Sequence, residues 1–179
     1  MMTAAYLRDA AMTAVIFGFF GSGWFGWAQE APPPRWSRRL AAGSIMSLAV
    51  ALAGGIIAWQ HWTDGTIFDP ETGRNFGIVV GIEFAVAGAG ALLLGLTKRK
   101  DLIPAWIAFV VGVHLFPVAV ILQYPMLHLV AALVTVVSLV AIPISRSRNL
   151  AVSFVVGLGT GLVLLAGAGY SLVSALIWR

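Results

Sequence analysis

The chain has 179 residues, of which 60% are hydrophobic and only 10% are charged. A soluble domain carries roughly 25% charged residues, so this chain has too few polar groups to cover a water-facing surface, and most of its surface must face lipid. It contains no cysteine, which excludes disulfides, thiolate metal sites and thiol catalysis. The net charge of +4 does not indicate nucleic-acid binding, because basic residues beside membrane spans set topology and contact anionic headgroups.

Six apolar stretches follow one another along the chain, separated by prolines, polar residues or basic clusters. Each is long enough to cross a membrane, since a spanning helix needs about 20 apolar residues. We expect spans at about 10–28, 40–59, 76–96, 102–122, 126–144 and 150–178. The predicted fold is all-α: a polytopic integral membrane protein with a single transmembrane domain over residues 1–179, built as a compact bundle of about six transmembrane helices.

Two of these spans have an alternative assignment. The break between spans four and five rests on Gln123, Tyr124 and Pro125, and the alternative is one long kinked segment. Span one could be a signal peptide, but its only nearby basic residue, Arg8, adjoins Asp9, and no small-x-small cleavage site follows the apolar core. We therefore expect it to be a retained helix.

The basic residues are distributed unevenly between the two sides of the membrane. The first, third and fifth connections carry eight of the eleven Lys and Arg residues: Arg35, Arg38, Arg39, Lys98, Arg99, Lys100, Arg146 and Arg148. The other three, Arg8, Arg74 and Arg179, belong to the opposite side. By the positive-inside rule the three basic connections are cytoplasmic and both termini are extracytoplasmic. The expected location is the cell membrane, as a multi-pass protein of the bacterial cytoplasmic membrane.

Small residues at four-residue spacing mark helix faces on which two backbones can approach closely. Two such rows predict helix packing: Gly77, Gly81, Ala85 and Ala89 in span three, and Gly18, Ser22 and Gly26 in span one. We interpret both rows as packing within the chain. The alternative is association, in which the partners besides the lipid bilayer are a second copy of the chain or a larger membrane complex.

Two ionisable residues fall well inside apolar spans, Glu83 in span three and His114 in span four. A charged side chain facing lipid is costly, so both should point inward. The two helices are consecutive and antiparallel, which puts both side chains at similar depth in the outer half of the membrane and predicts that they lie within hydrogen-bonding or one-water reach. On the face of Glu83, Ala87 and Gly90 leave room for a cavity or a closely packed neighbour.

Other polar residues lie toward the same outer side and complete the candidate ligand- or ion-binding set with Glu83 and His114: Gln123, Tyr124, His128 and Tyr170. A buried Glu–His pair can exchange a proton or hold a cationic ligand. Glu83, His114 and His128 could also form a nitrogen–oxygen metal site, although their spacing matches no known metal motif. The alternative is a pair that only stabilises the bundle. The sequence leaves the cofactor unknown.

Sequence motifs for enzymes are absent: the chain contains no HExxH, no GxSxG and no phosphate loop. The first hypothesis is therefore a protein that binds or transports a small solute or ion through a pocket in the outer half of the bundle. The second is a non-transporting accessory or interaction protein whose Glu–His pair is structural. A membrane-embedded enzyme is the third. The short connections have no room for an ATP- or DNA-binding domain.

Overall fold

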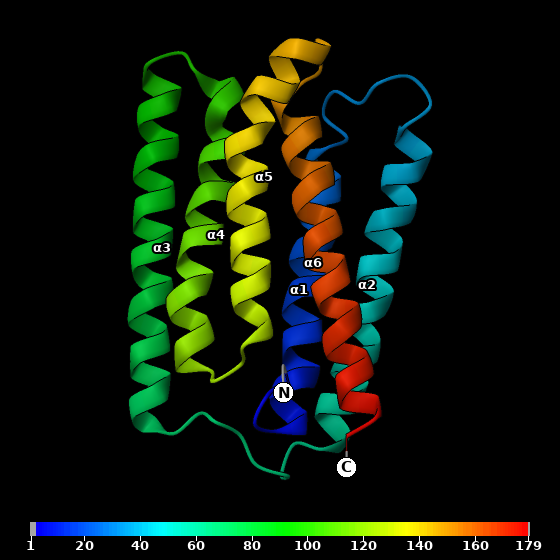
Figure 1. The fold of residues 1–179 in the computed structure, drawn as a ribbon, viewed down its shortest axis with the longest axis vertical. Helices are drawn as coiled ribbons and strands as arrows, with labels where there is room; N and C mark the ends of the chain where they lie inside the picture. Colours follow the sequence, from blue (N-terminus) through cyan, green and yellow to red (C-terminus); the bar gives the residue numbers. More distant parts are fainter. Residues whose placement is uncertain (1–2, 179) are drawn as a thin grey trace.

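A computed structural model of the chain describes residues 3–178. The described residues form six long helices and one short 3-10 helix, η1 (Lys100–Leu102), and all six are long and apolar enough to cross a membrane (Figure 1). The long helices are α1 (Leu7–Trp27), α2 (Ser37–Gln60), α3 (Pro70–Leu96), α4 (Ile103–Ile121), α5 (Met126–Arg148) and α6 (Val152–Leu176). This confirms the prediction of an all-α chain with six membrane-length helices.

Helices α3 and α5 extend beyond their apolar stretches. α3 begins at Pro70, because Asp69 caps it by accepting a hydrogen bond at 2.7 Å from the backbone N–H of Thr72. This hydrogen bond lowers the pKa of the Asp69 carboxyl. α5 continues to Arg148 and ends where Asn149 adopts a left-handed conformation. The predicted boundaries at 76 and 144 were therefore too short, since polar residues extend a helix beyond its apolar core.

The chain breaks between α4 and α5, as predicted. Gln123 has a positive φ of 48°, and Pro125 is the N-cap of α5. The side chain of Tyr124 is only 1% exposed and anchors this turn, with its hydroxyl 3.1 Å from the Ser171 hydroxyl of α6. The alternative of one long kinked helix is therefore wrong.

The connections divide between two ends of the molecule (Figure 1). The α1–α2, α3–α4 and α5–α6 connections lie together at one end, which we call the basic end because it carries the eight basic residues named above. The N-terminus, the C-terminus and the other two connections lie at the opposite, terminal end. Arg179, counted on that side, lies outside the described residues. The basic residues are thus separated by end in the fold.

Helices α1, α2 and α6 form a tightly packed group. A Cβ atom added at Gly18 of α1 would lie 2.6 Å from the backbone oxygen of Ser47 in α2. One added at Gly157 of α6 would lie 2.5 Å from the backbone oxygen of Trp24 in α1. Real Cβ contacts are never this short, so glycine is what lets these backbones touch. The row in span one packs in part as predicted, because Gly18 is buried whereas Gly26 is exposed and meets nothing.

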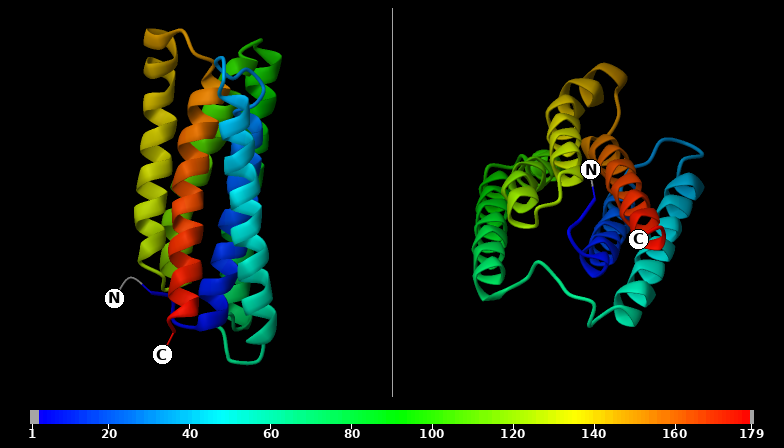
Figure 2. Two further views of the ribbon diagram at one scale, coloured as in Figure 1. Left: turned by 90° about the vertical axis from the view of Figure 1, so that its right-hand side faces the viewer. Right: turned by 60° about the horizontal axis from the view of Figure 1, so that its bottom comes forward.

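Helix α3 stands at the edge of the bundle and packs extensively only against α4. Figure 2 shows it on the side opposite α2, with the α2–α3 connection crossing the open side between them. No residue of α3 is buried. A Cβ atom added at Gly77 or Gly81 would meet nothing within 4 Å, and Ala85 and Ala89 are exposed. The predicted packing of this row within the chain is therefore wrong, and the bundle is open between α1 and α3 instead of compact.

Candidate functional site

Glu83 and His114 meet between α3 and α4. The Nε2 atom of His114 lies 3.2 Å from Oε2 of Glu83, and the two side chains are only 14–16% exposed. This confirms that the two side chains are within hydrogen-bonding reach. Glu83 sits midway along α3, equally far from Pro70 and Leu96. The pair is therefore deeper than the sequence indicated, because α3 begins earlier than its apolar stretch.

The second ring nitrogen of His114 determines how protons are distributed in this pair. Nδ1 lies 2.8 Å from the backbone carbonyl oxygen of Val111. A carbonyl oxygen only accepts hydrogen bonds, so Nδ1 carries a proton and donates it. The contact to Glu83 then contains one proton, held either by the carboxyl group or by Nε2. In both forms the pair has no net charge, which is how two ionisable groups can be tolerated at this depth.

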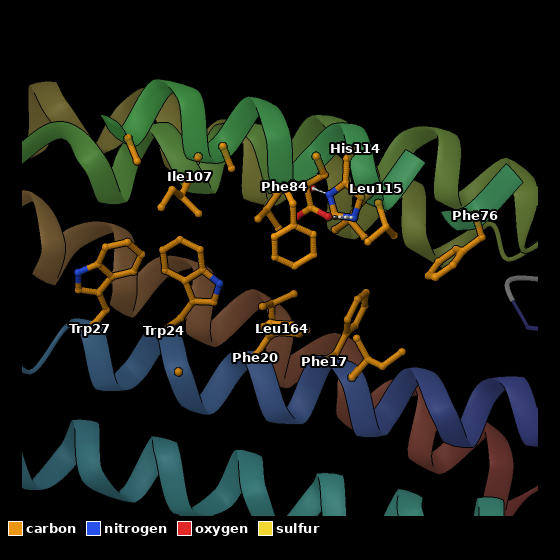
Figure 3. Close-up of a pocket in the computed structure, with 18 residues that line it drawn as sticks. Phe17, Phe20, Trp24, Trp27, Phe76, Phe84, Ile107, His114, Leu115 and Leu164 are labelled. Atoms are coloured by element: carbon orange, nitrogen blue, oxygen red, sulfur yellow. Dashed lines mark hydrogen bonds and ion pairs between the residues drawn. The ribbon is translucent and has the colours of Figure 1, made fainter. Parts of the chain in front are cut away.

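A cavity of about 680 Å³ lies beside the pair, between α1 on one side and α3 and α4 on the other (Figure 3). Its walls are almost entirely apolar. The six Phe and Trp side chains that line it are Phe17, Phe20, Trp24, Trp27, Phe76 and Phe84. Among its lining residues only Glu83 and His114 are ionisable. The cavity therefore offers a large apolar volume with one polar contact point.

The cavity is open on one side. Phe20 of α1 and Phe84 of α3 both line it, yet 51% and 66% of their surfaces are exposed. The opening lies where α1 and α3 do not pack closely, and it faces sideways from the bundle. In a membrane, an opening at this depth faces lipid chains.

The position of the cavity differs from the prediction of a pocket in the outer half. Its lining extends from Phe76 to Trp27 along the bundle, with Ala91 and Ile107 also near the basic end. It therefore extends along the bundle past the Glu83–His114 pair, from the level of Phe76 to the level of Trp27 near the basic connections. This extent could not be predicted, because the wall formed by α1 depends on how α1 faces α3.

A second cavity, of about 280 Å³, lies on the terminal side of His114. His114, Leu115, Ile16, Phe17 and Phe76 line both cavities. The smaller one is also lined by Arg8 and Asp9 of α1 and by Trp62, Thr66 and Phe68 of the α2–α3 connection. The imidazole of His114 thus lies between a large apolar chamber and a smaller chamber with polar groups at its terminal end.

Asp9 and Arg8 tie the α2–α3 connection to α1. The Asp9 carboxylate accepts hydrogen bonds at 2.7 Å from the Thr66 hydroxyl and from the backbone N–H of Ile67. Arg8 donates to the backbone oxygen of Trp62 at 2.8 Å, with its guanidinium over the Trp62 ring. We did not predict these contacts, since residues so far apart in sequence carry no shared motif.

A second polar contact holds α3 against α4. The indole N–H of Trp106 lies 3.3 Å from the backbone oxygens of both Val86 and Ala87. Its ring covers Gly90, where an added Cβ atom would be 2.0 Å from the indole nitrogen. The predicted space beside Glu83 is therefore used twice: Ala87 lines the cavity, and Gly90 accommodates the closely packed Trp106.

The remaining candidate residues lie away from the pair. Tyr124 is buried against Ser171, while Gln123, His128 and Tyr170 are exposed, and none of the four lines either cavity. Within residues 3–178, no group of three His, Asp or Glu side chains is placed to hold a metal ion. His128 instead contacts the ring of Phe116. Of the candidate set, Glu83 and His114 are the residues that line the cavities.

Comparison of the chain with protein-family models, with curated proteins and with solved structures finds no match. No family activity can therefore be transferred to these residues. The function has to be inferred from the cavity, from the shared proton of the Glu83–His114 pair and from the lateral opening. These features belong to a six-helix chain whose helices are suited to crossing a membrane.

Proposed function

We propose that the protein binds a small, mainly apolar solute in the cavity between α1, α3 and α4, and that it transports this solute. The cavity beside the Glu83–His114 pair is the observation that carries the proposal. Ligand sites are typically clefts of about 300–1,000 Å³ with apolar walls and a few polar groups that fix orientation. The cavity volume of about 680 Å³ and its single polar contact point match this description.

The packing of α3 supports the interpretation of the cavity as a ligand site. Empty apolar space destabilises a fold, because the lining atoms lose contacts. Nothing at Gly88, which lines the cavity, prevents a larger side chain on α3, since a Cβ atom there meets no neighbour within 4 Å. Instead, α3 is held at a distance from α1 by its contacts with α4.

The distribution of basic residues supports an orientation. Eight Lys and Arg residues gather at the basic end, so the positive-inside rule directs that end to the cytoplasm and both termini outward. This orientation suits a multi-pass protein of the bacterial cytoplasmic membrane. The large cavity would then extend from the middle of the bundle toward the cytoplasmic end, and the smaller one would lie toward the outside.

Binding is tested with 4-phenylpyridine, an aromatic probe with one basic nitrogen, by equilibrium dialysis of the purified protein in detergent. Ala87→Phe places a ring in the cavity and should reduce probe affinity at least tenfold. Ala85→Phe puts the same ring on the exposed face of the same helix, and it should bind as the unmodified protein does. Equal binding by both variants, or none by the unmodified protein, would refute the proposal.

Transport is tested separately from binding. Proteoliposomes containing the unmodified protein should take up radiolabelled 4-phenylpyridine faster than protein-free vesicles, and those containing Ala87→Phe should not. Binding without faster uptake would restrict the function to binding. The orientation in the vesicles is checked by labelling single cysteines at the two ends of the bundle with an impermeant thiol reagent.

A second candidate function is association without transport. The exposed row Gly77, Gly81, Ala85 and Ala89 is the observation that favours it, because small residues of this spacing allow another helix to approach. The partner would be a second copy of this chain or another membrane protein. Cysteine at Ala85 should then form a specific disulfide-linked product in membranes, whereas cysteine at Ala87, which faces the cavity, should not.

A further inference from the structure

We infer that the ligand is an apolar aromatic cation and that its binding releases one proton from the Glu83–His114 pair. This inference deepens the proposed function and rests on the cavity being a binding site. It follows from the charge of the lining, from the proton count of the pair and from the position of His114 between two cavities.

The lining favours a cation over a neutral or anionic ligand. Six aromatic rings face the cavity, and aromatic faces attract cations that lie against them. The lining contains no Lys or Arg, so an anion would meet no permanent positive charge there. The Glu83 carboxylate is the one side chain in the lining that can carry a negative charge. A charged ligand in this apolar volume therefore pairs with Glu83.

The proton count follows from the two hydrogen bonds of His114. With Nδ1–H donated to Val111, one further proton is shared by Nε2 and the Glu83 carboxyl. A cation added to this state would leave a net charge of +1 in an apolar site, which is strongly unfavourable. If the shared proton leaves, Glu83 is negative, His114 is neutral and the cation is positive. The site then stays neutral, and one proton is released for each cation bound.

The smaller cavity gives this proton a way out. His114 lines it as well as the large cavity, so the imidazole that loses the proton faces the chamber that contains Arg8 and Asp9. These two are the other ionisable residues that line either cavity among the described residues. Both are already engaged, Asp9 by Thr66 and Ile67 and Arg8 by Trp62. Glu83 and His114 are therefore the groups that exchange the proton.

The test uses three probes of one shape: the permanent cation N-methyl-4-phenylpyridinium, the neutral 4-methylbiphenyl and the anion biphenyl-4-carboxylate. Binding to the purified protein is measured by equilibrium dialysis against matched empty micelles, at several pH values. The cation should bind at least tenfold more tightly than the neutral probe. Because a proton is released on binding, its affinity should rise up to tenfold for each unit of increasing pH over the range in which the free pair holds that proton.

Proton release is measured directly, by titrating the cation into weakly buffered protein with a pH indicator. One proton should appear for each cation bound, and none for the neutral probe. Glu83→Gln should lose the preference for the cation and the proton release while keeping the binding of the neutral probe, which also shows that the variant is folded.

The outcomes separate this inference from the proposed function. Equal binding of cation and neutral probe without proton release, or a preference for the anion, would overturn the ligand class and leave the cavity as a binding site. Binding of the cation without proton release would overturn the exchange. Failure of all three probes, with the unmodified protein and Ala87→Phe behaving alike, would overturn the proposed function as well.

Discussion

The group formed by α1, α2 and α6 and the edge helix α3 use small residues in opposite ways. In the first, Gly18 and Gly157 lie against backbone atoms of the next helix, and an added Cβ atom would be 2.5–2.6 Å from them. On α3, an added Cβ atom at Gly77 or Gly81 would meet nothing within 4 Å. The same four-residue spacing therefore permits close approach but does not create it.

The difference determines how the cavity is enclosed. Tight packing of α1 against α2 and α6 leaves the aromatic face of α1, with Phe17, Phe20 and Trp24, directed toward the space beside α3. α3, which packs extensively only against α4, closes that space incompletely. A closely packed wall and an edge helix thus enclose the cavity together, and the edge helix carries Glu83.

The largest expected loss of stability comes from placing a large side chain between the closely packed helices α1, α2 and α6. Gly157→Leu should prevent folding or lower the free energy of unfolding by roughly 3 kcal/mol or more, because its side chain would overlap the backbone of α1 at Trp24 and Ala28. Gly81→Leu should leave stability unchanged. The measurement is thermal unfolding in detergent, with yield of monodisperse protein as a second readout. Comparable damage from Gly81→Leu would mean that α3 has a partner there.

A smaller effect is expected from breaking the contact between α3 and α4 at the pair. His114→Leu leaves the Glu83 carboxyl group without its partner and should cost roughly 3 kcal/mol. Adding Glu83→Leu should restore most of that loss, because no unpaired polar group remains. Solute binding by the double variant distinguishes a structural role of the pair from a role in binding. If the pair is purely structural, the double variant should regain both stability and binding. The proposed function predicts regained stability with altered binding.

Disturbing the contact between the Trp106 indole and Gly90 should lower the free energy of unfolding by less than breaking the Glu83–His114 pair. Gly90→Ala would force the Trp106 ring away from α3, with an expected loss of about 1 kcal/mol from the displaced hydrogen bond. Gly95→Ala is the matched control on the same helix, since its added Cβ atom meets nothing, and it should be neutral or slightly stabilising. Chemical or thermal unfolding of the two variants measures this difference in stability. If they behave alike, Trp106 does not hold α3.

Single cysteines at the two ends should change stability least, and they test which end faces the cytoplasm. Single cysteines at the exposed residues Ser37, Thr97 and Ser147 of the basic end should resist an impermeant thiol reagent in intact cells. A cysteine at Thr63, exposed at the terminal end, should react. Thr63 is preferable to Thr66, whose hydroxyl holds the Asp9 carboxylate. Labelling of Thr97 from outside would reverse the proposed orientation.

The sequence by itself determined the class of the protein, the number of helices and the meeting of Glu83 with His114. Length and hydropathy of each stretch suffice for the first two, since each helix satisfies its own backbone hydrogen bonds and needs no partner to be recognised. The pair was predictable because consecutive antiparallel helices place Glu83 and His114 at similar depth, and because lipid excludes their charges.

The tertiary structure alone decided which faces meet. Nothing in the spacing of Gly77 and Gly81 distinguishes them from Gly18, although the first two face outward and the third is buried. The aromatic wall of α1 and the Asp9 contacts with Thr66 and Ile67 were equally hidden, because they join residues more than 50 positions apart or across an unfilled space. In lipid both faces of a helix are apolar, so hydropathy carries no information about which face is turned toward a neighbour.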